Sequence, residues 1–95
     1  MKTDTTAEIG IGIIGTGGRG TTCLGQRIVE TCESTGFRVV ALNDINPERM
    51  EEARRFLSAK FAAKGVDVSI RCHDTDEALV ADPRVAIVLI TSPQY

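Results

Sequence analysis

The sequence predicts an α/β protein built on a doubly wound parallel sheet. Strand-like apolar segments alternate with amphipathic helical segments along its 95 residues. The first and last apolar segments lack polar alternation, which is typical of strands buried on both faces of a parallel sheet. The first segment also runs into a glycine-rich turn at residues 15–20. The length allows one small domain, expected over residues 9–95 after a loose tail at residues 1–8.

The composition fits a globular protein and argues against several function classes. Hydrophobic residues make up 42% of the chain and the net charge is −2, so neither disorder nor a basic nucleic-acid-binding surface is expected. No apolar stretch is long enough to cross a membrane, and residues 1–8 lack the apolar core of a secretion signal. The three cysteines form no C-x-x-C pair, so we expect reduced thiols in a cytoplasmic protein without a metal site.

The first strand and the first helix are separated by a change in periodicity. Residues 9–14 are apolar apart from two glycines, which predicts a buried strand. Residues 18–33 place Leu24 and Ile28 four positions apart, on one face of a helix. Gly36 suits the left-handed turn that commonly ends a helix.

The second strand and the second helix are separated by a capping signal. Residues 37–42 are mostly apolar and predict a strand. Asn46 is a good N-cap, and Pro47 suits the first helical turn because that turn needs no N–H group there. A helix is therefore expected over residues 47–64.

The last third of the chain predicts two strands around a short helix. Residues 66–72 alternate apolar and polar side chains, as a half-exposed strand near a sheet edge does. Asp74 and Glu77 have the spacing of a capping box at the start of a short helix. Residues 85–90 are wholly apolar and predict a central buried strand. The order β-α-β-α-β-α-β predicts a sheet with strand order 3-2-1-4.

The glycine-rich turn has the spacing G-x-G-x-x-G of a dinucleotide-binding loop. In such a loop the first glycine makes the tight turn, the second leaves room for the pyrophosphate, and the third lets the helix pack closely on the strand. The N–H groups at the start of the helix then face the phosphates, while a tight turn without a ligand is the alternative. The expected contacts are Gly15, Thr16, Gly17, Gly18, Arg19 and Gly20.

Asp44 follows the second expected strand, where a carboxylate accepts hydrogen bonds from the adenosine ribose. The same charge repels a 2′-phosphate, so NAD is expected rather than NADP. The neighbouring Ile45 is expected to line the same site. Arg49 would bind a 2′-phosphate if Asp44 turned away, and a capping role for Asp44 also stays open.

Thr91, Ser92 and Pro93 follow the last expected strand, where the strand order reverses and the ligand crevice of such sheets lies. We expect them to line the pyrophosphate and nicotinamide half of the cofactor, with a plain turn as the alternative. His73 is the single histidine of the chain, and a solvated loop histidine is expected. No catalytic constellation or cluster of metal ligands is visible.

Three blocks of the sequence together resemble the N-terminal domain of the Gfo/Idh/MocA family of nicotinamide-dependent oxidoreductases. They are Gly-Ile-Ile-Gly-Thr-Gly-Gly-Arg-Gly, Val-Val-Ala-Leu-Asn-Asp-Ile-Asn-Pro-Glu-Arg and Asp-Pro-Arg-Val-Ala-Ile-Val-Leu-Ile-Thr-Ser-Pro. The resemblance covers residues 9–95 and implies a Rossmann-type fold. It implies hydride transfer between the nicotinamide and a sugar- or polyol-like substrate. A family glycosidase that oxidises its substrate transiently, a non-catalytic nucleotide-binding module and, more remotely, a methyltransferase are the alternatives.

The resemblance also implies what this chain does not contain. The family's catalytic lysine, in a Glu-Lys-Pro motif, and its substrate domain would both follow Tyr95, so no catalytic residue is expected among these residues. The domain would then be incomplete at its C-terminus, which would leave residues 85–90 as a bare strand edge. Because bare apolar edges pair readily with other strands, we expect a homo-oligomer formed through this segment.

Overall fold

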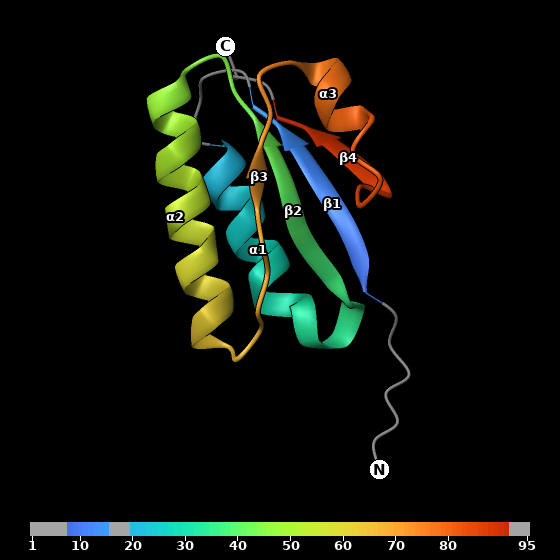
Figure 1. The fold of residues 1–95 in the computed structure, drawn as a ribbon. Coiled ribbons are helices and arrows are strands. Elements are labelled where there is room, and N and C mark those ends of the chain that lie inside the picture. The colour runs from blue at the N-terminus through green and yellow to red at the C-terminus, as the bar shows by residue number, and fades with distance from the viewer. Residues whose placement is uncertain (1–7, 16–19, 92–95) are drawn as a thin grey trace.

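The computed structural model describes residues 8–15 and 20–91, which form a four-stranded parallel sheet covered by helices (Figure 1). The strands are β1 (Ile9–Ile14), β2 (Phe37–Asn43), β3 (Arg71–Cys72) and β4 (Ile87–Ile90). The helices are α1 (Gly20–Thr35), α2 (Pro47–Ala63) and α3 (Asp76–Val80). The strands lie in the order β3-β2-β1-β4 and all pair in parallel. This confirms the predicted Rossmann-type α/β fold and its strand order.

The sheet buries an apolar core on each of its faces. On one face, α1 and α2 pack on β1 and β2, and Ile13, Leu57 and Phe61 are wholly inaccessible there. On the other face, Leu79 of the short helix α3 packs with Ile14 of β1 in a smaller cluster. The two clusters explain why β1 reads as apolar along its length, because its side chains alternate between two dry faces.

Two glycines allow neighbouring segments to approach closely. A Cβ atom on Gly10 would lie 1.8 Å from the carbonyl oxygen of Arg84, so the chain before β4 can pass β1 only where no side chain exists. A Cβ atom on Gly25 would lie 2.6 Å from Leu57, so α1 and α2 meet at this position. The sequence analysis did not predict the contact between the helices at Gly25.

The end of α1 and the start of α2 agree with the prediction. Gly36 has φ 78°, the left-handed conformation expected after α1. The side chain of Asn46 accepts hydrogen bonds from the N–H groups of Glu48 and Arg49, at 3.0 and 3.1 Å. Pro47 then occupies the first helical turn, as predicted.

The third strand is shorter than the alternation over residues 66–72 predicted. Only Arg71 and Cys72 pair with β2, whereas Val66 and Val68 lie before the strand. Both valines still pack against the core beneath α2, so the alternating pattern reflects side-chain burial without backbone pairing. The helix that follows is capped by Thr75, not by Asp74, because the Thr75 hydroxyl accepts the N–H of Ala78 at 3.0 Å.

The prediction that residues 85–90 form a central buried strand is wrong in one respect. In the described part of the chain β4 lies at the edge of the sheet and pairs with β1 alone. Its terminal residues Ile87 and Ile90 are 37% and 67% exposed. An apolar segment indicates a preference for burial. It does not indicate whether a strand pairs with the segment on each side.

Replacing Asn46 with alanine removes the cap at the start of α2. We expect the free energy of unfolding to fall by about 1 kcal/mol, because the first N–H groups of the helix lose their acceptor. Urea unfolding followed by circular dichroism measures the change. Asn46→Asp is the matched control, since a carboxylate oxygen also caps a helix, and an equal loss in both variants would contradict the capping role.

Candidate functional site

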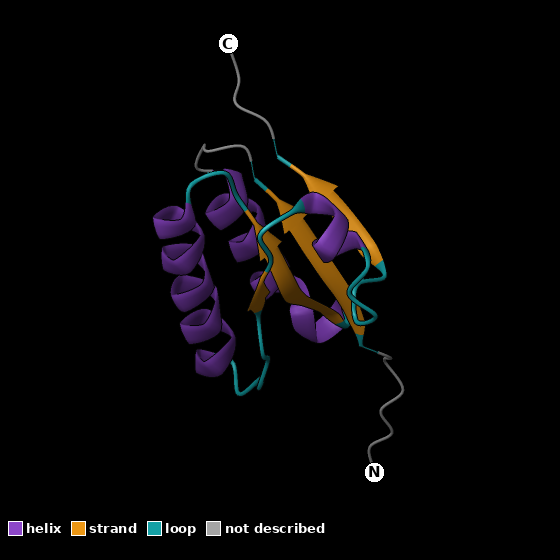
Figure 2. Ribbon diagram, turned by 45° about the horizontal axis from the view of Figure 1, so that its top comes forward, coloured by secondary structure: helices purple, strands orange, loops and turns teal. Residues whose placement is uncertain are grey.

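The carboxyl ends of β1, β2 and β4 lie next to one another at the same end of the sheet (Figure 2). The register places Ile14 beside Asn43 on one side and beside Ile90 on the other. Backbone hydrogen bonds hold the residues that follow β1 and β4. The N–H of Gly15 donates to the backbone carbonyl oxygen of Asn43 at 2.7 Å, and the N–H of Thr91 donates to that of Ile14 at 2.9 Å. The fold therefore gathers the ends of three strands where the predicted site lies.

The glycine-rich turn joins this edge to the start of α1. Gly15 is buried at the end of β1, and Gly20 is the first residue of α1. The first N–H groups of a helix lack partners within the helix and attract phosphate. The predicted contacts Thr16, Gly17, Gly18 and Arg19 lie outside the described residues, as do Ser92 and Pro93.

Asp44 follows β2 directly and is 8% exposed. Its Oδ1 atom accepts the N–H of Asn46 at 2.9 Å, which fixes the side chain at the turn before α2. Within the described residues no donor is bonded to the other oxygen, Oδ2. One carboxylate oxygen of Asp44 thus closes the turn before α2.

The two other residues predicted on the adenosine side lie on the same connection. Ile45 is 77% exposed, an unusual position for a large apolar side chain. Arg49 is half-buried in the first turn of α2. Its Nε atom is buried and has no hydrogen-bond partner among the described residues. The side chain of Ile45 is therefore open to solvent at this end of the sheet, whereas Nε of Arg49 is enclosed by protein.

A buried carboxylate ties three distant segments together. The side chain of Asp82 is wholly inaccessible, and its Oδ2 lies 2.9 Å from Nε2 of His73. Its Oδ1 accepts the backbone N–H of Arg84 at 2.9 Å, and the Arg84 guanidinium contacts the same carboxylate. The guanidinium also donates to the carbonyl oxygens of Ser69 and Val40, at 2.7 and 2.9 Å. The hydrogen bonds from Arg84 hold the pKa of Asp82 well below its usual range, with His73 adding to them and burial opposing.

The prediction that His73 is a solvated loop histidine is wrong. The residue does follow β3, but its side chain is 13% exposed and pairs with Asp82. The backbone N–H of His73 donates to the carbonyl oxygen of Leu42 at 2.8 Å. Its backbone carbonyl oxygen accepts a hydrogen bond from Nδ2 of Asn43 at 2.7 Å. Sequence reasoning missed Asn43, Asp82 and Arg84 as well. One of these contacts had a signal in the sequence. Asp82 stands before Pro83 and Arg84, and an aspartate at the start of a turn commonly accepts the backbone N–H two residues later.

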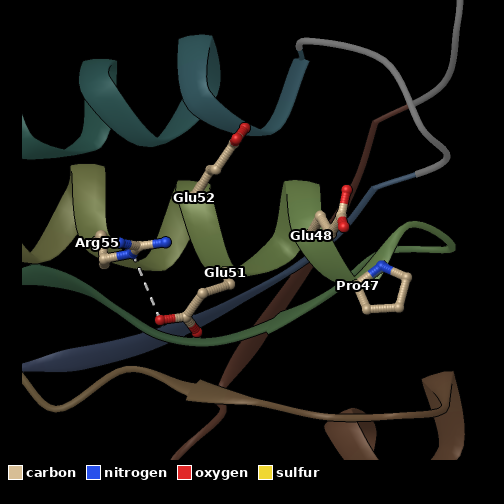
Figure 3. Close-up of a pocket in the computed structure, with 5 residues that line it drawn as sticks. All are labelled: Pro47, Glu48, Glu51, Glu52 and Arg55. Atoms are coloured by element: carbon tan, nitrogen blue, oxygen red, sulfur yellow. Dashed lines mark ion pairs between the residues drawn. The ribbon is translucent and has the colours of Figure 1, made fainter.

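A separate surface pocket of about 410 Å³ lies along α2 (Figure 3). It is lined by Pro47, Glu48, Glu51, Glu52 and Arg55. Nε of Arg55 lies 3.6 Å from Glu51, one turn away on the same helix. In the described part of the chain no three acidic, histidine or cysteine side chains are grouped so that they could hold a metal ion. The pocket is a charged surface of the first turns of α2.

Replacing Asp82 with asparagine tests the buried carboxylate. Because the folded-state pKa of Asp82 lies below the value of an unfolded aspartate, about 3.9, its ionised form stabilises the fold fully above that pH. This contribution is lost as the pH falls toward the folded-state pKa. We expect Asp82→Asn to lower the free energy of unfolding by about 2 kcal/mol at neutral pH, and by progressively less below about pH 4.

Urea unfolding at a series of pH values measures both effects. Asp67→Asn, at an exposed carboxylate outside the network, is the control. A destabilisation by Asp82→Asn that does not change with pH would contradict the role of the charge.

The comparisons with known proteins agree with this geometry. Residues 9–95 match the family model GFO_IDH_MocA, described as an oxidoreductase family with an NAD-binding Rossmann fold. No curated protein matches the chain. No helix in the described residues is long and apolar enough to cross a membrane. Since the family model covers nearly the whole chain and its fold is the one observed, the chain belongs to the Gfo/Idh/MocA oxidoreductase family and forms an NAD-binding Rossmann domain.

Proposed function

We propose that this domain binds NAD for hydride transfer to or from a sugar- or polyol-like substrate. The observation that carries the proposal is the meeting of Gly15, Asp44 and Thr91 at the carboxyl edge of the sheet. In open α/β sheets, dinucleotides bind at this edge, where the strand order reverses. The bound nicotinamide supplies the hydride chemistry, and the chain supplies binding and orientation.

Each part of the proposed site has a separate task. Oδ2 of Asp44 accepts a hydroxyl of the adenosine ribose, and the exposed side chain of Ile45 packs against the adenine. The turn at residues 15–20 binds the pyrophosphate through backbone N–H groups. Thr91, with Ser92 and Pro93, borders the nicotinamide half. We assign no catalytic residue to these 95 residues, and we propose that the groups that choose the substrate and move the proton lie outside them.

The choice between NAD and NADP depends on two side chains. The carboxylate of Asp44 disfavours a 2′-phosphate by charge repulsion, which supports NAD. The buried, unpartnered Nε of Arg49 is the feature that would support NADP, because a guanidinium binds phosphate readily. Asp44 adjoins the strand end and is held in place by Asn46, so we favour NAD.

Replacing Asp44 with alanine tests both the site and the preference. We expect NADH to bind about tenfold or more weakly, because a charged hydrogen bond is worth about 1.5–3 kcal/mol. NADPH should lose less affinity, since the repulsion of its phosphate is removed as well. Isothermal titration calorimetry with NADH and NADPH measures the two constants.

Asp67→Asn is the control for the loss of a surface charge. If the Asp44→Ala variant binds both cofactors as the unchanged protein does, Asp44 does not belong to the site. If the unchanged protein binds neither cofactor, the proposed function itself fails.

We propose two further properties, a location in the cell and a contact between two copies of the chain. The described residues contain three free cysteines, Cys23, Cys32 and Cys72. Thiols stay reduced in the cytoplasm, so we propose a cytoplasmic location. We also propose that a second copy of the chain pairs with the free edge of β4.

The edge of β4 has the features of a pairing surface. Beside it, α1 and the sheet form a groove of about 470 Å³, lined by Ile87, Leu89 and apolar residues of α1 and β1. Arg27 and Glu30 also line the groove, so it carries no net charge that would oppose a second copy. An unpaired apolar edge is a template for another strand.

A lysine at Ile87 should disrupt this pairing. Ile87 is exposed at the start of β4, and lysine at a strand edge prevents edge-to-edge association. We expect the unchanged chain to sediment as a dimer and Ile87→Lys to sediment as a monomer. Analytical ultracentrifugation at several concentrations measures both, with Val80→Lys on α3 as the matched control for charge. A monomeric unchanged chain would refute the interface.

A further inference from the structure

We propose that Asn43 is a positioning residue of the cofactor site, because it sets the backbone that carries both Gly15 and Asp44. The inference rests on the proposed NAD site and adds a residue that touches no cofactor itself. Asn43 is the last residue of β2 and is 7% exposed. Its position at the strand end puts it between the two parts of the site.

Three contacts join Asn43 to the elements around the site. Its side-chain Nδ2 donates to the carbonyl oxygen of His73 at 2.7 Å. Its own carbonyl oxygen accepts the N–H of Gly15 at 2.7 Å. Asp44 follows it directly in the chain. A shift of Asn43 therefore moves the first glycine of the phosphate loop and the ribose-binding carboxylate together.

The side chain of Asn43 replaces a missing part of the sheet. The strands β2 and β3 pair at only two positions, Ala41 with Arg71 and Leu42 with Cys72. Beyond them, the N–H of His73 still bonds to Leu42, and the next bond comes from the amide of Asn43. Burying an amide costs free energy unless it is hydrogen-bonded, so an apolar residue would be the simpler choice for packing. The amide is explained by the need to hold the strand end in place.

The anchor of Asn43 is itself held on several sides. The side chain of His73 lies against the buried carboxylate of Asp82. Arg84 grips that carboxylate and also donates to Val40, in the middle of β2. The carbonyl oxygen that Asn43 bonds is thus fixed relative to β2 in two ways, through the backbone N–H of His73 on Leu42 and through the contacts of Asp82 and Arg84 that reach Val40. Because the carbonyl oxygen of His73 is fixed, its hydrogen bond with the amide of Asn43 can hold the end of β2 in place.

The decisive variant is Asn43→Leu, which keeps the size of the side chain and removes its donors. We expect the NADH dissociation constant to rise by about tenfold, because the loss of one hydrogen bond relaxes the strand end that aligns two ligand contacts. We also expect the backbone N–H of Gly15 to exchange with deuterium faster, by more than the global loss of stability explains. NMR-detected hydrogen exchange and calorimetry measure these two effects.

Val39→Ala is the matched control, because it removes core packing on the same strand without touching the network. It should lower the free energy of unfolding and leave the NADH dissociation constant unchanged. If Asn43→Leu lowers stability but changes neither NADH binding nor Gly15 exchange beyond this control, Asn43 is merely structural and the inference is overturned. Asn43→Ala, which also removes the amide donors but adds no apolar bulk, provides the same comparison if the leucine variant does not fold.

The two proposals can fail separately. If the unchanged protein does not bind NADH, the proposed function fails. The exchange rate of Gly15 still decides whether the side chain of Asn43 holds the phosphate turn. Faster exchange in Asn43→Leu than in Val39→Ala supports the positioning role, and equal exchange overturns it.

Discussion

The Asp82 carboxylate is the buried charge on which the carboxyl side of this fold depends. It has no solvent contact, so it must be satisfied by protein donors, and it obtains them from His73 and Arg84. Those partners belong to the end of β3 and to the segment before β4, and the guanidinium of Arg84 continues to β2. One charge therefore fixes three strands relative to one another.

This network compensates for a weak part of the sheet. The pairing of β3 with β2 is only two residues long, and α3 has only five residues. Backbone pairing therefore contributes few hydrogen bonds at this side of the sheet. Hydrogen bonds to a buried charge are stronger than neutral ones, so a few of them replace a longer ladder. The β3 side of the sheet carries this polar network, whereas the face under α1 and α2 is held by apolar packing.

The proposed cofactor site is built from backbone at one end and from side chains at the other. At the proposed phosphate end, the start of α1 offers backbone N–H groups, which attract phosphate whatever nucleotide carries it. At the proposed adenosine end, the side chains of Asp44, Ile45 and Arg49 would distinguish one nucleotide from another. Asn43 lies between them and contacts β1 through its carbonyl oxygen and β3 through its amide. The geometry of the two ends is therefore coupled through one residue.

The sequence by itself determined the order of the elements, the fold class, the cap at Asn46 and the place of Asp44 after β2. These features follow from local periodicity and turn chemistry, which act over a few residues. Only the tertiary structure decided the pairing of His73 with Asp82, the reach of Arg84 to β2, the role of Asn43 and the exposure of β4. Asn43 and His73 are 30 residues apart, and Arg84 and Val40 are 44 residues apart. Such partners meet only when parallel strands are laid side by side, and no local pattern in the chain records which polar groups then face one another.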